Sequence, residues 1–357
     1  GDVLGCTSEE CFGVPLLPGG LDFESVNSSV DKQIAVFGEA RYAVTDTLKL
    51  LVGARYARTK FTFSNFQDGP LSGGASGASG SNKEKPFTPK LGVTFEPDGR
   101  SLYYATVSKG FRVGGANPQV PADRCGNDLA NLGIATTPTE YNADEVWNYE
   151  VGIKKGLFDR RLQANVSAFW IDWKNIQQNV YLPLCGFQYT DNLGKAVSKG
   201  FDIELQARPT LGLTLGANVS YIHSRYTEDV EGGALVGSGD QLPFPPWTVS
   251  LTAEFERPVG RGEAYLFGQY NYSSAYDRLP DAPAAAFDPV VNRLPKIQTV
   301  TMRGGYRVGD LDLSLFVDNL FDSGDITYYR HDVIGSQLEH STALRPRTIG
   351  LTASFRY

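Results

Sequence analysis

Histidine and cysteine, which often act as general bases, nucleophiles or zinc ligands, are rare in this sequence. The 357 residues include three histidines, His223, His331 and His340, and no serine lies in a Gly-x-Ser-x-Gly elbow. The four cysteines form no Cys-x-x-Cys pair and have no histidine at zinc-ligand spacing. The sequence therefore predicts no catalytic residues, no metal site and no cofactor.

The cysteines are better suited to disulfides in an oxidising compartment. Cys6, Cys11, Cys125 and Cys185 allow three pairings, and their spacing alone selects none. We predict Cys6–Cys11, because the two lie close in the chain, and Cys125–Cys185, which would join two loops on the same side of the molecule.

Composition narrows the class of protein. The chain carries 33 basic and 40 acidic side chains, a net charge of −7, which argues against a nucleic-acid partner. Mean hydropathy is −0.25, and no apolar run is long enough for a membrane-spanning helix. Transmembrane strands alternate apolar and polar residues, however, so this mean is also compatible with a membrane β-barrel.

The elements that must position any site are strands. Apolar residues recur at every second position, for example at Leu211, Leu213 and Leu215 and again at Ile349 and Leu351. About thirteen such segments are expected, many much longer than the roughly six residues usual in soluble proteins. They lie near 31–44, 47–63, 86–96, 101–113, 144–156, 160–181, 188–208, 211–227, 241–257, 262–277, 295–308, 311–329 and 344–357.

The connections between these segments alternate in length. Short turns alternate with long loops near 64–85, 114–143, 228–240, 278–294 and 330–343, with one shorter exception at 182–187. This is typical of a barrel in an outer membrane, with tight periplasmic turns and long outside loops. The sequence therefore predicts an all-β protein, a transmembrane antiparallel up-and-down β-barrel in contact with outer-membrane lipid.

The strand count and the first residues indicate an incomplete barrel. Bacterial single-chain barrels have even strand numbers, so thirteen strands require others upstream. We expect residues 1–30 to form an extracellular loop segment and 31–357 to form the C-terminal portion of a larger barrel. In that barrel Leu215 and Val219 should face lipid, whereas Asn218 and Ser220 should face the lumen.

Several segments resemble TonB-dependent outer-membrane receptors. They are SKGFRVGGANPQ at 108–119, NYEVGIKKGLFDRRLQANVSAFWIDWKNIQ at 148–177, GKAVSKGFDIEL at 194–205, VDNLFD at 317–322 and RPRTIGLTASFRY at 345–357. The resemblance implies part of a barrel of about 22 strands in the bacterial outer membrane. It also implies a plug domain and a TonB box, neither of which this sequence contains, so TonB would engage the missing N-terminal region.

The resemblance implies active uptake of a scarce, bulky extracellular ligand, such as a siderophore, haem, cobalamin or an oligosaccharide. A passive porin or substrate-specific channel is the alternative, with an expected 16–18 strands. Candidate ligand contacts are polar and aromatic residues of the loops and strand ends, namely Arg112, Asn117, Tyr141, Trp147, Tyr189, Tyr329 and His331. The Gly/Ser-rich stretch within 67–85 is expected to be mobile rather than a binding wall.

Overall fold

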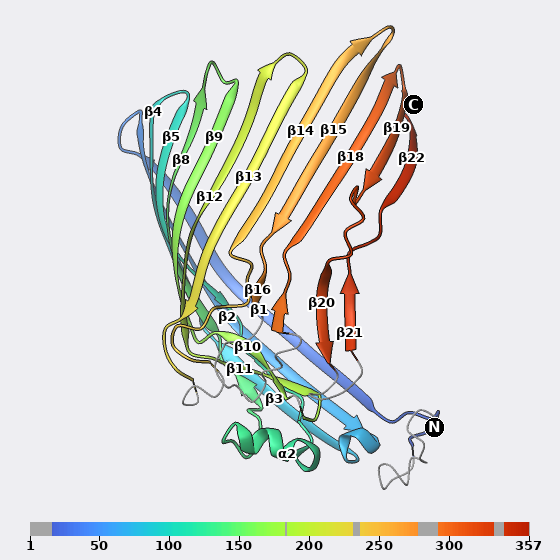
Figure 1. Cartoon of the computed structure of the whole chain (residues 1–357). Helices are drawn as coiled ribbons and strands as arrows, with labels where there is room; N and C mark the ends of the chain where they lie inside the picture. Colours follow the sequence, from blue (N-terminus) through green and yellow to red (C-terminus); the bar gives the residue numbers. More distant parts are fainter. Residues whose placement is uncertain (1–15, 183, 231–235, 278–291, 332–338, 357) are drawn as a thin grey trace.

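The computed structural model of this chain is built around one long antiparallel sheet (Figure 1). The structure describes residues 16–182, 184–230, 236–277, 292–331 and 339–356. Thirteen strands follow one another along the sheet in chain order. They are β1 (Glu24–Ala43), β2 (Leu48–Asp68), β4 (Phe87–Asp98), β5 (Ser101–Arg112), β8 (Asp144–Leu157), β9 (Leu162–Lys174), β12 (Lys195–Thr210), β13 (Leu213–Tyr226), β14 (Trp247–Val259), β15 (Gly262–Ser273), β18 (Ile297–Val308), β19 (Leu311–Asp318) and β22 (Thr348–Phe355).

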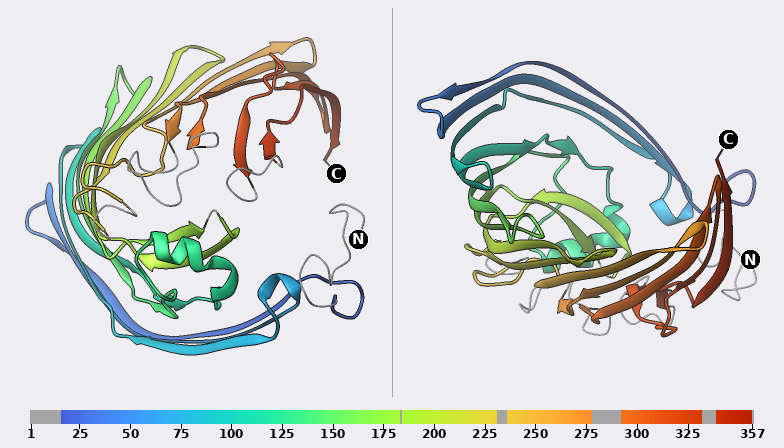
Figure 2. Two further views of the ribbon diagram at one scale, coloured as in Figure 1. Left: turned by 60° about the horizontal axis from the view of Figure 1, so that its bottom comes forward. Right: turned by 90° about the horizontal axis from the view of Figure 1, so that it is seen from above.

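The sheet curls into a trough that does not close (Figure 2). A fourteenth strand, β3 (Ser76–Glu84), pairs with β2 alone. Strands β1 and β22 are the two edges, and neither has a second partner among the described strands. The up-and-down order, the thirteen consecutive strands and the two open edges confirm the predicted incomplete barrel.

The two faces of the sheet differ in chemistry. Leu215 is 39% exposed, and its side of the sheet continues through Leu251 and Leu351, which are also exposed. On the opposite side, the Tyr104 hydroxyl donates to Glu150 at 2.5 Å, and Asn165 donates to Glu204 at 2.9 Å. One face is therefore an apolar surface and the other a hydrogen-bonded polar wall.

The polar face is the concave one. Arg112 and Asp144 lie on the same side of the sheet as Tyr104 and Glu150, because no register shift separates them. Arg112 also contacts Gln177, whose hairpin lies inside the curve of the trough (Figure 2). Leu215 and Val219 are thus on the convex face, and Asn218 and Ser220 on the concave face, as predicted.

Tight turns connect the strands at one end of the trough. The chain turns through left-handed conformations at Phe158 and Asp159, with φ of 50° and 53°. At Gly212 (φ 79°) a β-carbon would lie 2.1 Å from the Glu256 carbonyl oxygen, so the turn requires glycine. These turns gather at the upper end of the molecule in Figure 1.

The remaining elements lie at the opposite end, in the long connections. They are the 3-10 turn η1 (Pro70–Ser72), β6 (Gly115–Ala116), α2 (Ala122–Asn131), β7 (Glu140–Tyr141), β10 (Gln177–Leu182), β11 (Phe187–Asn192), β16 (Tyr276–Asp277), β17 (Arg293–Leu294), β20 (Ile326–His331) and β21 (Glu339–Ala343). Over the described residues, no helix has the length and apolar character needed to cross a membrane.

Three expected strands are interrupted. The segments expected at 160–181 and 188–208 bend at Asn175 (φ 54°) and Gly194 (φ 61°), and the chain between them forms the separate hairpin β10–β11. The segment expected at 311–329 breaks at Asn319 and Asp322, which also have positive φ. A strand cannot continue through such residues, so the short connection expected at 182–187 is only the tip of a long loop.

Two expectations for the N-terminal part were wrong. Strand β1 begins at Glu24, so residues 24–30 belong to the sheet rather than to an extracellular loop segment. The Gly/Ser-rich stretch is also ordered, because β3 pairs with β2 over nine residues, from Thr59↔Glu84 to Gln67↔Ser76. Strand pairing uses backbone hydrogen bonds, which small side chains leave intact.

Candidate functional site

The long loops between β5 and β13 pack together over the concave face. Helix α2 and hairpin β10–β11 lie inside the curve of the trough (Figure 2). They share a buried apolar cluster with the neighbouring loops and strand ends, consisting of Val120, Cys125, Leu129, Leu132, Ile176, Val180, Leu182, Tyr189, Leu193, Ala196, Tyr226, Val236 and Leu242. We call the assembly of α2, β10, β11 and this cluster the loop platform.

A disulfide and a buried carboxylate join the two main parts of the platform. Cys125 of α2 is bonded to Cys185 at the tip of the β10–β11 hairpin, with their Cα atoms 5.2 Å apart. This is the pairing predicted from the sequence. Asp128, one helical turn further, accepts backbone N–H bonds from Leu184 and Cys185 at 3.0 Å. Burial raises the pKa of Asp128, although these two hydrogen bonds act in the opposite direction.

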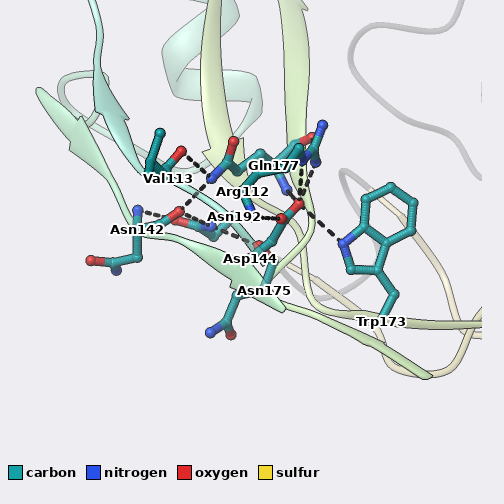
Figure 3. Close-up of polar contacts among 8 residues, drawn as sticks. All are labelled: Arg112, Val113, Asn142, Asp144, Trp173, Asn175, Gln177 and Asn192. Carbon is teal, nitrogen blue, oxygen red and sulfur yellow. Dashed lines mark hydrogen bonds and ion pairs between the residues drawn. The ribbon is translucent and has the colours of Figure 1, made fainter. Parts of the chain in front are cut away.

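A second buried carboxylate anchors the platform to the barrel wall (Figure 3). Asp144, at the start of β8, is almost fully buried and pairs with the Arg112 guanidinium. It accepts Arg112 Nε–H at 2.8 Å, the Trp173 indole N–H at 3.0 Å and the Gln177 backbone N–H at 3.4 Å. The guanidinium lies 5.2 Å from the centre of the Trp173 ring. Three strand ends and the hairpin therefore meet at one carboxylate.

Two amide side chains connect the loops around this carboxylate. The Gln177 amide donates to the carbonyl oxygens of Val113 and Asn142 at 3.0 and 2.9 Å. The Asn192 amide donates to the carbonyls of Asn142 and Asn175 at 3.0 and 2.7 Å (Figure 3). Each amide satisfies backbone groups that leave the sheet ladder where the strands end.

Two predicted ligand contacts have structural partners. The Asn117 side chain is buried; it donates to the carbonyls of Pro138 and Thr190 and accepts the Thr190 N–H at 2.7 Å. Tyr189 is 2% exposed and belongs to the apolar cluster. Both side chains are covered because the loops pack on one another, and contact with a ligand stays a prediction for them.

A third predicted contact lies on the other side of the sheet. Trp147 alternates with Asn148 and Glu150 along β8 and shares the convex face with Tyr149 and Val151, which are 42% and 56% exposed. It therefore faces the membrane side of the wall, not the loop platform. Its position near a strand end suits a membrane-interface aromatic.

The other sequence candidates are distributed around the mouth. Tyr141, in β7, packs against Gly115, and its carbonyl accepts an N–H from Asn82 at 3.2 Å. Tyr329 is half-buried in β20. His331 ends β20, and its side chain lies outside the described residues, as do Cys6 and Cys11. Only Arg112 occupies the centre of the arrangement.

Sequence reasoning missed Asp144, Trp173, Gln177 and Asn192 as parts of this centre. Gln177 and Trp173 lie in the motif at 148–177, and Asn175 before Gln177 marks the point where the strand turns inward. Those signals were available. Asp144 carried none, because one carboxylate at a strand start is ordinary until its partners are known. Over the described residues, no group of three or more potential ligands could hold a metal ion.

The centre can present a cation and an aromatic ring to the lumen. Three of the Arg112 N–H groups are directed to Asp144 and the Gln177 carbonyl, yet its side chain is 51% exposed. The guanidinium is therefore held in place while part of it stays open to solvent. A fixed guanidinium beside an indole suits a flat anionic ligand.

A family model described as TonB dependent receptor-like, beta-barrel, matches residues 13–320. Among curated relatives, the metal-pseudopaline receptor CntO of Pseudomonas aeruginosa is 26% identical over 87% of this chain. The ferric-pyoverdine 358 receptor of Pseudomonas putida is 25% identical over 91%. The chain spans 39% and 35% of the lengths of these two proteins.

Solved structures show the same architecture. The ferric yersiniabactin uptake receptor FyuA of Yersinia pestis superposes with a TM-score of 0.74 at 18% identity, covering 95% of this chain and 48% of FyuA. The copper transporter OprC gives a TM-score of 0.69 at 16% identity, covering 92% of this chain and 48% of OprC. The family match covers well over half of the sequence, so the chain belongs to the β-barrel of TonB-dependent receptors of the bacterial outer membrane.

Proposed function

We propose that this chain forms the ligand-capture side and part of the conduit of a receptor for active uptake of a siderophore-type metal chelate. The observation that carries the proposal is the loop platform, which places Arg112 and Trp173 on the concave face at the loop end of the trough. The named relatives are receptors for metal–pseudopaline and ferric pyoverdine, which supports the same ligand class here.

The chemistry of the platform supports a chelate ligand. Siderophore complexes combine negatively charged donor groups with flat aromatic or conjugated parts. A guanidinium held by Asp144 offers charge without a large loss of side-chain entropy on binding, and the Trp173 ring offers a stacking surface. Because these groups are ordered before the ligand arrives, binding would require little rearrangement.

The proposal includes coupling to TonB. TonB would act on the whole receptor, as in the family. Family membership favours this function over a passive porin.

Binding to the full-length receptor tests the proposal. We expect intrinsic tryptophan fluorescence or calorimetry to detect saturable binding of ferric pyoverdine or of a metal–pseudopaline complex. Arg112→Gln should weaken binding at least about tenfold, as expected for the loss of one charged hydrogen bond. Arg41→Gln is the matched control, because Arg41 also faces the lumen but pairs with Glu39 near the turn end.

Two outcomes would contradict the proposal. One is the absence of binding by the unmodified receptor to either class of chelate. The other is equal affinity of the Arg112→Gln and unmodified receptors. Hydrogen exchange of β10–β11 in the Arg112→Gln receptor separates a lost ligand contact from a disordered platform.

A further inference from the structure

A row of lysines crosses three neighbouring strands on the convex face. Lys32 of β1 is directly opposite Lys60 of β2, and Lys60 is directly opposite Lys83 of β3. All three side chains are exposed. Directly opposed residues on one face have Cβ atoms about 5 Å apart, and like charges at that spacing destabilise a sheet.

No neighbouring acid offsets this repulsion among the described residues. The lysines that form described ion pairs are others, namely Lys49, Lys90, Lys109 and Lys195. Arg58, two residues before Lys60 on the same face, is also exposed and adds a fourth positive charge. In a chain of net charge −7, so many aligned cations indicate a site for an external anion.

The position of the lysine row along the strands, relative to the hydrocarbon layer, identifies the kind of anion. The convex residues of β2 from Leu48 to Tyr56 are apolar or small, and this nine-residue stretch is followed directly by Arg58 and Lys60. A membrane-spanning strand needs about 9–11 residues. The lysine row therefore lies just beyond the hydrocarbon layer, on the side of the long loops, where lipid headgroups are found.

Other lysines lie at the end of the apolar convex stretch further along the sheet, but they have partners. Lys199 lies opposite His223, directly after the apolar convex residues of β12, and its ammonium is 5.4 Å from the centre of the Trp170 ring. Lys174 lies opposite Lys195, but Lys174 also lies opposite Glu145, and Lys195 pairs with Glu228 at 2.8 Å. The row of opposed lysines without a described acidic partner is therefore the one on β1, β2 and β3.

We propose that the convex rim, centred on Lys32, Lys60 and Lys83, binds phosphate groups of phosphorylated lipid headgroups in the outer leaflet. Lysine ammonium groups bind phosphate as compact charges with three donors each, and a phosphate seated between opposed lysines converts their repulsion into attraction. The lipid acyl chains would then lie on the apolar surface of Val52, Tyr56 and Phe87, directly below.

The test is native mass spectrometry of the full-length receptor in neutral detergent with added diphosphorylated lipid A. The triple variant Lys32→Gln, Lys60→Gln, Lys83→Gln should bind the lipid at least about tenfold more weakly, since each surface lysine contributes a several-fold factor. The control triple variant Lys49→Gln, Lys90→Gln, Lys154→Gln removes the same charge from the concave face and should bind within about twofold of the unmodified receptor.

A second measurement detects misfolding. In lipid-free neutral detergent, the Lys32, Lys60, Lys83 variant should melt at the same temperature as the unmodified receptor or at a higher one, because repulsion is removed. Added lipid should raise the melting temperature of the unmodified receptor more than that of the variant. Equal lipid binding by this variant and the unmodified receptor would overturn the proposal. Three other results would also overturn it. The control variant could lose as much lipid binding as the Lys32, Lys60, Lys83 variant, or the unmodified receptor could retain zwitterionic phosphatidylcholine as well as lipid A. A soluble acidic peptide of matched charge could also displace the lipid.

Discussion

Arg112 and Asp144 occupy the same register position on neighbouring strands, and their side chains meet on the concave face of the barrel wall. Arg112 is the last residue of β5 and Asp144 the first of β8, so the pair closes the sheet ladder at the point where a long loop leaves it. The same carboxylate holds Trp173 and Gln177, which connects the sheet to the platform.

Asp144→Asn should loosen the loop platform. The amide keeps one acceptor but loses the charge that binds Arg112, and a hydrogen bond to a charged group contributes about 1.5–3 kcal/mol. We expect the free energy of local opening of β10–β11 to fall by about 2 kcal/mol, measured by hydrogen exchange.

Asp172→Asn is the control for that change. Asp172 also accepts an indole N–H, from Trp170 at 2.9 Å, but in a more exposed setting on the convex face. It should change the opening free energy by less than about 0.5 kcal/mol. If β10–β11 is equally protected from hydrogen exchange in the Asp144→Asn and unmodified proteins, Asp144 does not anchor the platform.

Removing the Cys125–Cys185 disulfide should release α2 from the hairpin. The bond closes a loop of 60 residues, which corresponds to about 4 kcal/mol on the chain-entropy model. The double variant Cys125→Ala, Cys185→Ala should be cleaved by proteases within the loops far faster than the oxidised protein, while the barrel stays folded in gel-migration assays. Unchanged cleavage would show that the apolar cluster alone holds α2.

The burial of Asp128 should make the platform less stable at neutral pH than in mild acid. Its folded-state pKa is raised above the unfolded value, so the folded platform takes up a proton first as pH falls, and stability increases on passing downward through the folded pKa. Protection factors of the Leu184 and Cys185 amides, corrected for intrinsic exchange, should rise accordingly.

Asp128→Asn should flatten that pH dependence. The amide oxygen can still accept both backbone N–H groups but does not ionise. A pH profile as steep as that of the unmodified protein would assign the effect to another group.

The orientation of β13 predicts that an arginine substitution destabilises the protein by different amounts on the two faces of the strand. Leu215→Arg should cost about 2–4 kcal/mol if refolded into bilayers within the full receptor, because the charge enters hydrocarbon. Asn218→Arg should cost much less, because the concave face at that level carries Glu204 in register and is hydrated. Equal penalties would contradict the facing of this strand.

The sequence alone determined the two-residue repeat of the strands, the face of the sheet on which each side chain lies, and the end of the barrel that carries the long loops. Strict alternation around Leu215 fixes which residues share a face, because a strand has a repeat of two and one face is apolar. The alternation of short and long connections placed the loops at one end. Cys125 and Cys185 were pairable from the sequence because both lie in loops at that end.

Only the tertiary structure decided what the loops do. Asn117 and Tyr189 are polar or amphipathic loop residues, and burial depends on what packs over them, which the sequence does not encode locally. Asp144 acquires its role from Arg112, Trp173 and Gln177, which are brought to it from three other segments of the chain. The lysine row likewise depends on strand register, because Lys32, Lys60 and Lys83 are distant in sequence and become neighbours only when backbone pairing aligns β1, β2 and β3.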